Sequence, residues 1–550
     1  MAEIRESRKA RGAFFTPPAI ADFLAGWAVA DSPDARVLDP TCGEAVFLLA
    51  AGRRLKAAGC ATEDLDQRLY GVDIHRDSLR EAASLVEAKG LDAHLLASNF
   101  FDVATPDQLG CPLPQMDAVI GNPPFVRYQL HTGDARKRSA KAALQQGVQL
   151  SGLASSWAAL VVHACAFLKP EGRLAMVLPA ELLTVHYAEP VRRWLRRRFR
   201  AVNLVMFDRL QFEDALEKVV LVLGRGSGGC DAFSLYHVAD ADDLAHIKPF
   251  DEFAVPFVDE GKWTDLLLPI AQRQLFRRVV AEHFTPLREY GSPELGTVTG
   301  ANDFFALNET TRVRYGLTEN QVTPISPPGT RYLRGTALTK SDWESLRVAD
   351  ERVWLLYPEP DDVAPGLRRY IRHGRDLGVH KAYKCTIRDP WWRPPRVPAP
   401  DLFFTYMSHR FPRLIANTAR TSFVNSMHGV RLHSGLKRAK QALPILALNS
   451  VTMLGAELSG RSYGGGILKM EPREAASLPV PSADVLDAAW RVLSSERSHL
   501  DHELRNGRWT SVLARVDEVL LRQTLELDPA EADSLHEAAR GLRERRLGSA

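Results

Sequence analysis

Short apolar runs alternate with amphipathic stretches along the first half of the chain, and most runs end at a polar or glycine-containing turn. The pattern predicts strands at residues 35–38, 69–74, 94–97, 117–121 and 168–179, separated by segments with helical periodicity. Strands that alternate with helices in this way are typical of a parallel sheet covered by helices on both faces. We therefore predict a doubly wound α/β domain for this half of the chain.

The predicted strand at 117–121 leads into a loop with the sequence Gly-Asn-Pro-Pro-Phe. The two prolines push Asn122 and Pro123 away from helical geometry, so we expect their backbone carbonyls to stay free as acceptors. Together with the side-chain oxygen of Asn122 and the ring of Phe125, they would suit a planar amino group on an aromatic base. Asn and Pro are also common in ordinary turns, so the loop alone leaves a purely structural turn as an equal alternative.

Two other predicted strands end at a carboxylate. Asp39 opens an Asp-Pro-Thr-Cys-Gly turn, and Asp73 follows Gly-Val. A dinucleotide-binding sheet would carry Gly-x-Gly-x-x-Gly at the first turn, so we expect no pyrophosphate cradle here. A turn that presents a carboxylate suits a cationic ligand, such as the aminoacyl and sulfonium end of S-adenosylmethionine, while Asp73 is placed to bind ribose hydroxyls.

Composition limits the class of protein. A length of 550 residues and a hydrophobic content of 45% predict two to four globular domains. The chain has no apolar run of membrane-spanning length and a charged N-terminus, so we expect no membrane segment and a cytoplasmic location. Its six cysteines form no Cys-x-x-Cys pair, and we expect neither a metal site nor disulfides.

The net charge of +3 does not indicate a nucleic-acid partner, but its distribution does. Between residues 361 and 440 there are 16 Lys and Arg against 5 Asp and Glu, a net charge of +11, which leaves −8 for the rest of the chain. This window is a plausible contact surface for a polyanion.

The order of these motifs resembles one family. Phe-Thr-Pro-Pro precedes Asp-Pro-Thr-Cys-Gly, which is followed by Gly-Val-Asp, Asn-Phe-Phe and Asn-Pro-Pro-Phe. This order, which extends over residues 11–224, is similar to that of the gamma class of N6-adenine DNA methyltransferases from restriction-modification systems. The resemblance implies a Rossmann-like, seven-stranded methyltransferase sheet of the class I S-adenosylmethionine-dependent fold.

The resemblance also assigns roles by position. The catalytic loop would be Asn122, Pro123, Pro124 and Phe125, and the target base would stack between Phe125 and Phe212. The cofactor would contact Phe15, Thr16, Asp39, Pro40, Thr41 and Gly43 through its methionine part, Asp73 through its ribose, and Asn99 with Phe100 or Ile74 through its adenine. The chain departs from the family pattern in having Asn99 for Asp, Ala45 for a second glycine and Phe125 for Tyr. Thr16 is further predicted to cap the first helix, with Pro17 at the first helical position.

In the second half of the chain the predicted elements are shorter, and Pro and Gly are more frequent. We predict a catalytic domain at 1–250, a connecting segment at 251–290, a mixed α+β target-recognition domain at 291–482 and a helical tail at 483–550 that packs on the recognition domain or on a partner. Candidate DNA-binding residues are Arg331, Arg334, Lys384, Arg388 and Arg393.

The predicted function is site-specific methylation of adenine N6 in duplex DNA, with base flipping and S-adenosylmethionine as cofactor. Methylation of RNA bases or of protein glutamine uses the same loop and is an alternative, as is a DNA-recognition subunit with little turnover. The long region after the catalytic domain favours DNA. A restriction endonuclease, if one accompanies the enzyme, is expected to be a separate chain.

Overall fold

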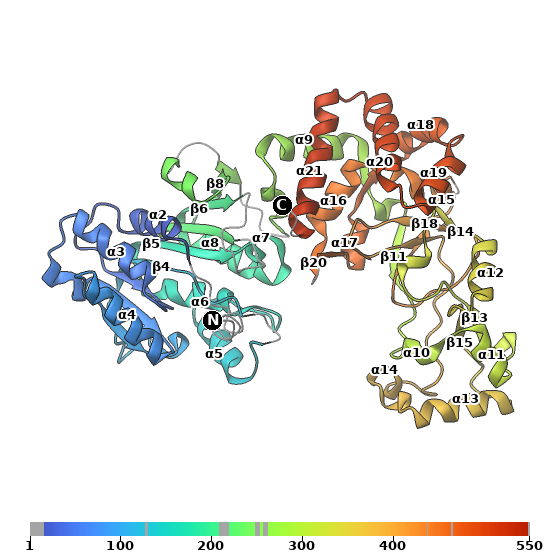
Figure 1. The fold of residues 1–550 in the computed structure, drawn as a ribbon, viewed down its shortest axis with the longest axis horizontal. Coiled ribbons are helices and arrows are strands. Elements are labelled where there is room, and N and C mark those ends of the chain that lie inside the picture. Colours follow the sequence, from blue (N-terminus) through green and yellow to red (C-terminus); the bar gives the residue numbers. More distant parts are fainter. Residues whose placement is uncertain are drawn as a thin grey trace. The chain divides into compact units, whose positions relative to one another are not determined.

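The computed structural model describes residues 16–126, 130–207, 219–247, 254–256, 262–362, 364–436, 438–463 and 466–547. The chain divides into two compact units, Met1–Leu267 and Leu268–Ala550 (Figure 1). The division falls inside the segment 251–290 that the sequence predicts to connect two domains.

Unit 1 is built on one mixed sheet with the strand order β3-β2-β1-β4-β5-β7-β6-β8-β9. The strands from β3 to β5 are parallel, whereas β7 is antiparallel to both β5 and β6. The strands are β1 (Val37–Asp39), β2 (Leu69–Asp73), β3 (His94–Ala97), β4 (Met116–Gly121), β5 (Leu168–Pro179), β6 (Phe199–Phe207), β7 (Val219–Ser227), β8 (Ala232–Val238) and β9 (Ala254–Pro256).

Both faces of the sheet centre are covered, because β5 is buried at six successive positions from Leu174 to Pro179 and side chains alternate between faces along a strand. Helices α2 and α6 both pack on β5. The helices of unit 1 are α2 (Pro18–Val29), α3 (Val46–Ala57), α4 (Arg76–Ala88), α5 (Gly133–Gln145), α6 (Ser156–Ala164), α7 (Glu181–Thr184) and α8 (Glu189–Arg198).

The α/β class predicted from the sequence is confirmed, with two corrections. The sheet has nine strands in the described residues instead of seven, and its outer edge is formed by β8 paired with β6 and β9 paired with β8. Thr16 does not cap the first helix. Pro17 is the residue before α2 and Pro18 begins it, so the Thr16 hydroxyl lies one position too early to reach the first amides.

Unit 2 contains smaller sheets. Its largest, in the order β11-β19-β16-β18-β14, has five strands, and the others have two or three. The strands are β10 (Phe284–Pro286), β11 (Gly291–Leu295), β12 (Ala306–Leu307), β13 (Val322–Pro324), β14 (Ala337–Leu338), β15 (Trp354–Leu356), β16 (Leu402–Phe404), β17 (Met407–Ser408), β18 (Leu414–Asn417), β19 (His428–Leu432), β20 (Arg461–Tyr463), β21 (Ile467–Lys469) and β22 (Pro479–Pro481).

Helices lie at both ends of this unit, with α10, α13 and α14 at one end and the C-terminal helices at the other (Figure 1). They are α9 (Ile270–His283), α10 (Asn302–Phe305), α11 (Glu309–Tyr315), α12 (Lys340–Val348), α13 (Pro365–Asp376), α14 (Tyr383–Thr386), α15 (Ala439–Leu446), α16 (Ser450–Ser459), α17 (Pro472–Ala476), α18 (Ala483–Leu493), α19 (Arg497–Arg505), α20 (Trp509–Asp517) and α21 (Pro529–Leu547).

The C-terminal helices pack on the rest of unit 2. Helix α21 lies against α9 and α16, and α18 lies against α15. On α19, the Asp501 carboxylate accepts hydrogen bonds from the Thr336 amide and hydroxyl, both at 2.7 Å. Arg505 donates to both Asp501 and Asp342. The tail helices are therefore tied to the segment around β14 by a half-buried polar network.

Within the described ranges no single helix is long and apolar enough to cross a membrane. Helices α15 and α16 pass that test together across a bend of 81°, and most of their residues are buried inside unit 2.

Candidate active site

The carboxyl ends of β1, β2, β4 and β5 meet at one edge of the unit 1 sheet. The strand order reverses between β1 and β4, since the chain crosses from β3 at one edge back to β4 beside β1. Ligands of open α/β sheets bind outside the carboxyl ends of the strands at such a switch point. The predicted motifs at Asp39, Asp73 and Asn122 all follow strands that end there.

The turns after β1 and β2 are joined through Asp73. Its carboxylate accepts a hydrogen bond from the Gly43 amide at 3.0 Å and another from the His75 amide at 2.8 Å. Gly43 has φ of +47°, and no heavy atom lies within 4 Å of where its Cβ would be. The glycine therefore allows the left-handed turn and leaves open space beside Asp73.

Asp39 lies directly beneath this turn and is only 1% exposed. One carboxylate oxygen accepts from the Thr41 amide at 3.0 Å. The pKa of Asp39 is raised to about 7, mainly by burial and also by the nearby Asp73 charge, against the lowering effect of the Thr41 hydrogen bond. A Cβ on Gly121, the last residue of β4, would lie 2.9 Å from the Asp39 carboxylate, so this position must be glycine for the two strand ends to meet.

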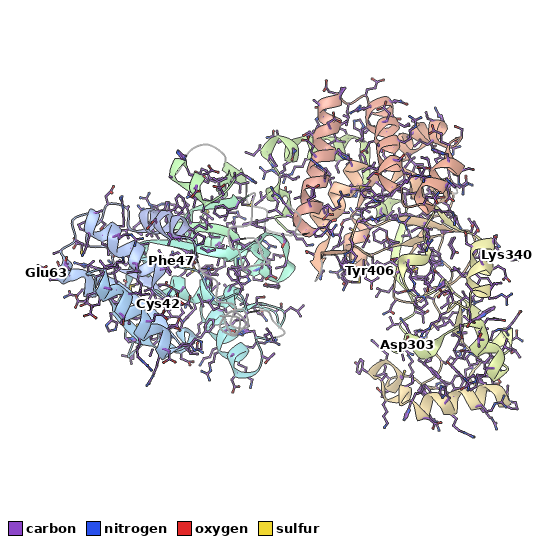
Figure 2. The ribbon with its side chains drawn as sticks, viewed as in Figure 1. Cys42, Phe47, Glu63, Asp303, Lys340 and Tyr406 are labelled. Atoms are coloured by element: carbon purple, nitrogen blue, oxygen red, sulfur yellow. The ribbon has the colours of Figure 1, made fainter. Side chains whose placement is uncertain are left out.

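Cys42, in the same turn, belongs to the core. Figure 2 shows Cys42 and Phe47 inside unit 1 and Glu63 at its edge, and Cys42 is 5% exposed. Burial, together with the charges of Asp39 and Asp73, raises the pKa of its thiol. The thiol therefore stays protonated and is not a candidate nucleophile.

Asn122, directly after β4, has one half of its amide fixed and the other half open. Its Nδ2 donates to the Thr16 hydroxyl oxygen at 3.2 Å. Its Oδ1 is buried and accepts no hydrogen bond from any described residue. The Pro123 carbonyl likewise receives no hydrogen bond from the described part of the chain. A buried acceptor without a donor is costly, so this pair of oxygens indicates a ligand that brings N–H groups.

The other end of the loop is held by Ser156 at the start of α6. The Ser156 hydroxyl donates to the Pro124 carbonyl at 2.5 Å and accepts from the Val126 amide at 3.0 Å. The Ser156 amide also donates to the Val126 carbonyl at 3.0 Å. One residue thus satisfies the backbone on both sides of Phe125, whose ring is 8% exposed and packs with the core of unit 1.

A half-buried polar cluster adjoins Ser156. Tyr187 donates to the Glu181 carboxylate, which also accepts from the Trp157 indole at 3.4 Å and the Ser155 hydroxyl at 3.5 Å. Burial and the Glu181 charge raise the pKa of Tyr187, which therefore remains a donor. Arg192 holds the segment between them by donating to the carbonyls of Leu182 and Val185.

The positions predicted to bind the cofactor's adenine have different surroundings. Ile74 is 58% exposed beyond the end of β2, whereas Phe100 is 4% exposed and packs with His163 and Phe167. Asn99 is half-buried, and its Oδ1 accepts from the Phe101 amide at 3.1 Å. Of the two candidates, Ile74 offers the free apolar surface.

The candidate DNA-binding residues of unit 2 also differ from one another. Arg388 donates to the carbonyls of Val298 and Thr299, and Arg393 donates to the Pro358 carbonyl and to Glu359. Their guanidinium groups therefore hold the fold together. Arg331, Arg334 and Lys384 are exposed; Arg331 pairs with Tyr332 and Glu351, and Lys384 lies over the Tyr383 ring.

Phe15 and Phe212 lie outside the described residues. No motif in the sequence indicated Ser156, Glu181 or Tyr187. The rule that identified Asp39 and Asp73, a carboxylate just after a predicted strand, would also have selected Glu181, which follows β5 by two residues. No comparable rule would have selected Ser156, because its hydrogen-bond partners lie 30 and 32 residues away in the sequence.

Two family models match successive parts of the chain. The N-6 DNA methylase model matches residues 2–202, and the model for the C-terminal domain of the type II methyltransferase M.Eco57I matches residues 260–521. Both matches show that the chain is similar to the N6-adenine DNA methyltransferases of restriction-modification systems. The resemblance predicted from the motifs is thus confirmed, and the chain is a DNA methyltransferase.

Relatives match along both units. Type II methyltransferase M.AccI of Acinetobacter calcoaceticus is 21% identical over 94% of this chain and 94% of its own. Type II methyltransferase M.XamI of Xanthomonas campestris pv. amaranthicola is 25% identical over 87% of this chain and 86% of its own. Among solved structures, the type IIG restriction endonuclease BpuSI is 13% identical, with 99% of this chain and 67% of its own covered and a TM-score of 0.46. The assignment rests on the sequence matches.

Proposed function

We propose that this methyltransferase transfers a methyl group from S-adenosylmethionine to N6 of an adenine flipped out of duplex DNA, at a specific sequence. It acts in the cytoplasm as the modification component of a restriction-modification system, with the nuclease as a further partner. The target adenine binds at the Asn122 loop, and unit 2 recognises the DNA.

The observation that carries this proposal is the pair of oxygens at Asn122 and Pro123. Because Nδ2 of Asn122 is engaged by Thr16, its Oδ1 is the atom that faces a ligand. The exocyclic amine of adenine has two hydrogens in the plane of the ring, one for each oxygen. A carbonyl group of another base at this place would meet two acceptors and leave both unsatisfied.

The residues at the edge of the sheet fit S-adenosylmethionine. Asp39 supports a cationic group, and the Thr41 hydroxyl is buried without a hydrogen-bond partner among the described residues. The open space at Gly43 lies beside Asp73, whose carboxylate suits ribose hydroxyls. Ile74 offers apolar surface for the adenine ring. When bound, S-adenosylmethionine supplies the methyl group as an electrophilic sulfonium substituent.

The residues of the chain make the adenine amine more nucleophilic. The N6 lone pair is delocalised into the ring, and two acceptors on its hydrogens draw the nitrogen toward tetrahedral geometry, so the lone pair localises. The Asn122 and Pro123 oxygens do this from a buried, fixed loop, where such contacts are stronger than in water. The positive charge that develops on N6 is stabilised by the same two oxygens, and positioning supplies most of the remaining rate.

Stacking would hold the flipped base in the site. Phe125 lies in the sequence between the two residues whose backbone groups Ser156 fixes, and its ring is proposed to cover one face of the adenine. Phe212 is proposed to cover the other face. Each such contact contributes about 1–3 kcal/mol and offsets the cost of removing the base from the duplex.

The experiment is to incubate the purified chain with tritiated S-adenosylmethionine and plasmid DNA, and to sequence the product for N6-methyladenine. Asn122→Ala and Phe125→Ala are compared with Asn320→Ala, which alters an exposed residue of unit 2, and cofactor binding is measured for each by calorimetry. We expect label at adenines in one recurrent sequence, lost in Asn122→Ala and retained in Asn320→Ala.

Absence of label on duplex DNA with cofactor binding intact would overturn the proposal in favour of RNA or protein glutamine as substrate. DNA binding without transfer to any of these substrates would identify a recognition subunit instead.

A further inference from the structure

Helix α13 presents a row of arginines on the side opposite its buried face. Gly366, Leu367, Tyr370 and Gly374 are buried. Arg368, Arg369, Arg372 and Arg375 are all exposed. Positions three, four and seven apart lie on one side of a helix, so these guanidinium groups project from a common surface. The surface continues into the next turns, where Lys381 and Lys384 are also exposed.

These six basic side chains have no carboxylate partner among the described residues, although many other arginines of unit 2 do. Arg312, Arg347, Arg505 and Arg515, for example, each lie within 3.1 Å of a carboxylate oxygen. From residue 365 to 384 the sequence contains only one acidic residue, Asp376, against the six bases. The positive charge of this surface is therefore left without compensation inside the chain.

Exposed apolar side chains gather at the same place. Leu377, Tyr383 and Ile387 are 63%, 73% and 62% exposed, and they lie within eleven residues of one another. Solvating three large apolar groups beside six cations that have no carboxylate partner gives no stability to the unit, and the one backbone contact among these cations is from Arg369 to the Tyr315 carbonyl at 3.4 Å in the described residues. The combination is suited to a partner that is both polyanionic and partly apolar.

The surface is rigidly supported. The Tyr370 hydroxyl donates to the Phe304 carbonyl at 2.7 Å, and the two rings stack with centroids 4.6 Å apart. A Cβ on Gly374 would lie 2.5 Å from the Phe304 ring, so the helix packs directly on that ring. Beyond α14, Arg388 donates to the carbonyls of Val298 and Thr299. Asp303, labelled in Figure 2, marks helix α10 next to this support.

We propose that this surface, which we call the α13 surface, binds the phosphate backbone of duplex DNA through its arginines and lysines. Leu377, Tyr383 and Ile387 contact deoxyribose and base edges in the adjoining groove. The inference rests on the proposed function, because it names the part of unit 2 that holds the DNA. Arg368 and Arg375 are about 10 Å apart along the helix axis, which equals the axial rise of about three base pairs of duplex DNA.

The test measures the affinity of the full chain for a duplex carrying its methylation site, over a range of salt concentrations. The triple variant Arg368→Ser, Arg372→Ser, Arg375→Ser should bind on the order of 10–100-fold more weakly. The slope of log K against log salt should fall in magnitude by about 0.9 for each phosphate that is no longer neutralised, or about 2.7 for three phosphates. A charge-matched control replaces three exposed arginines elsewhere in unit 2, Arg473, Arg491 and Arg540, and should leave the slope unchanged.

Two further variants separate the parts of the surface and test folding. The triple exchange of the same arginines for lysine keeps the charge and should keep the slope. Tyr383→Ser with Ile387→Ser should weaken binding on the order of tenfold with the slope unchanged, because no ionic contact is removed.

A slope that stays at the wild-type value in the Arg→Ser triple variant would overturn the inference while leaving the proposed function intact. An equal decrease of the slope in that triple variant and in the charge-matched control would also overturn it. A slope change seen only with an RNA duplex would assign the surface to RNA. A wild-type chain that binds no duplex DNA would instead sink the proposed function itself.

Discussion

The side-chain amide of Asn122 donates to the hydroxyl of Thr16 at 3.2 Å, across 106 positions of sequence. The contact joins the segment before the first helix to the loop after β4, and it fixes which end of the Asn122 amide faces outward. An unanchored amide would present NH2 to the target amine as readily as oxygen, and NH2 cannot accept its hydrogens. Thr16 is thus a positioning residue for the loop, in addition to its predicted place near the cofactor.

Replacing Thr16 with Val keeps the shape of the side chain and removes this acceptor. We expect the single-turnover rate of methylation at saturating cofactor to fall about 10–100-fold. The lost hydrogen bond is worth about 1–3 kcal/mol, and without it the Asn122 amide is no longer held in the correct orientation. Thr16→Ser, which keeps the hydroxyl, should retain most of the rate. If Thr16→Val weakened cofactor binding but left the saturated rate unchanged, the positioning role would be wrong.

Ser156 should affect rate and cofactor binding differently. Ser156→Ala removes the hydrogen bonds to the Pro124 carbonyl and the Val126 amide, so the loop around Phe125 loosens. We expect the single-turnover rate to fall about tenfold or more, because leaving these two backbone groups without a hydrogen-bond partner costs about 1–3 kcal/mol. Cofactor affinity should not change, because Ser156 touches neither the β1 nor the β2 turn. Ser151→Ala, an exposed serine nearby, should change neither quantity.

The sequence predicted the parts of the site that depend on local pattern. Asp39 and Asp73 each follow an apolar strand, and Asn122 lies between a strand and two prolines, so neighbouring residues suffice to place them at a sheet edge. The role of Thr16 could not be predicted in this way. Its hydrogen-bond partner lies on another element. Thr16 also does not cap the first helix, because Pro17 is the residue that directly precedes α2.

The sequence also could not predict which basic residues of unit 2 are free to contact a ligand. Arg388 and Arg393 lie in the basic window, yet backbone carbonyls and Glu359 engage them. Arg368, Arg372 and Arg375 in the same window have no such partners among the described residues. Sequence composition gives the sum of charges, but only the packing around each guanidinium decides whether that charge reaches a ligand.

Cofactor binding should release protons near neutral pH. The pKa of Asp39 rises to about 7 in the folded chain from 3.8, so this carboxyl favours folding at low pH, and the advantage is lost as pH rises from about 4 to about 7. A cationic group bound beside it favours the carboxylate and lowers its pKa. The dissociation constant for S-adenosylmethionine should therefore increase about tenfold from pH 8 to pH 6.

Calorimetry in buffers of different ionisation enthalpy measures this linkage directly. At pH 6.5 we expect a fraction of a proton released per cofactor bound, and none at pH 9, where Asp39 is already ionised. Asp39→Asn should bind more weakly and lose most of the pH dependence. An unchanged proton release in that variant would assign the linkage to another group.

Arg546, near the C-terminal end of α21, should be the most sensitive position of the helical tail. Its guanidinium and the Glu457 carboxylate on α16 are 5% and 6% exposed, and they are joined by two hydrogen bonds of 2.8 Å. Arg546 also donates to the carbonyls of His409, Arg410 and Gly466. Removing it leaves a buried carboxylate and three carbonyls without their donor.

We expect Arg546→Ala to lower the free energy of unfolding of unit 2 by about 3–5 kcal/mol, because breaking a buried ion pair leaves one charge uncompensated. Arg540→Ala on the same helix breaks only an exposed pair with Glu544 at 3.9 Å and should cost less than about 1 kcal/mol. Urea titration of the full chain, with amide exchange followed along α21 and along β5, separates loss of unit 2 from loss of unit 1. Adding Glu457→Leu to Arg546→Met should recover much of the stability, because the buried charge is then gone. If the single and double variants lost equal stability, the cost would come from the carbonyl contacts and not from the ion pair.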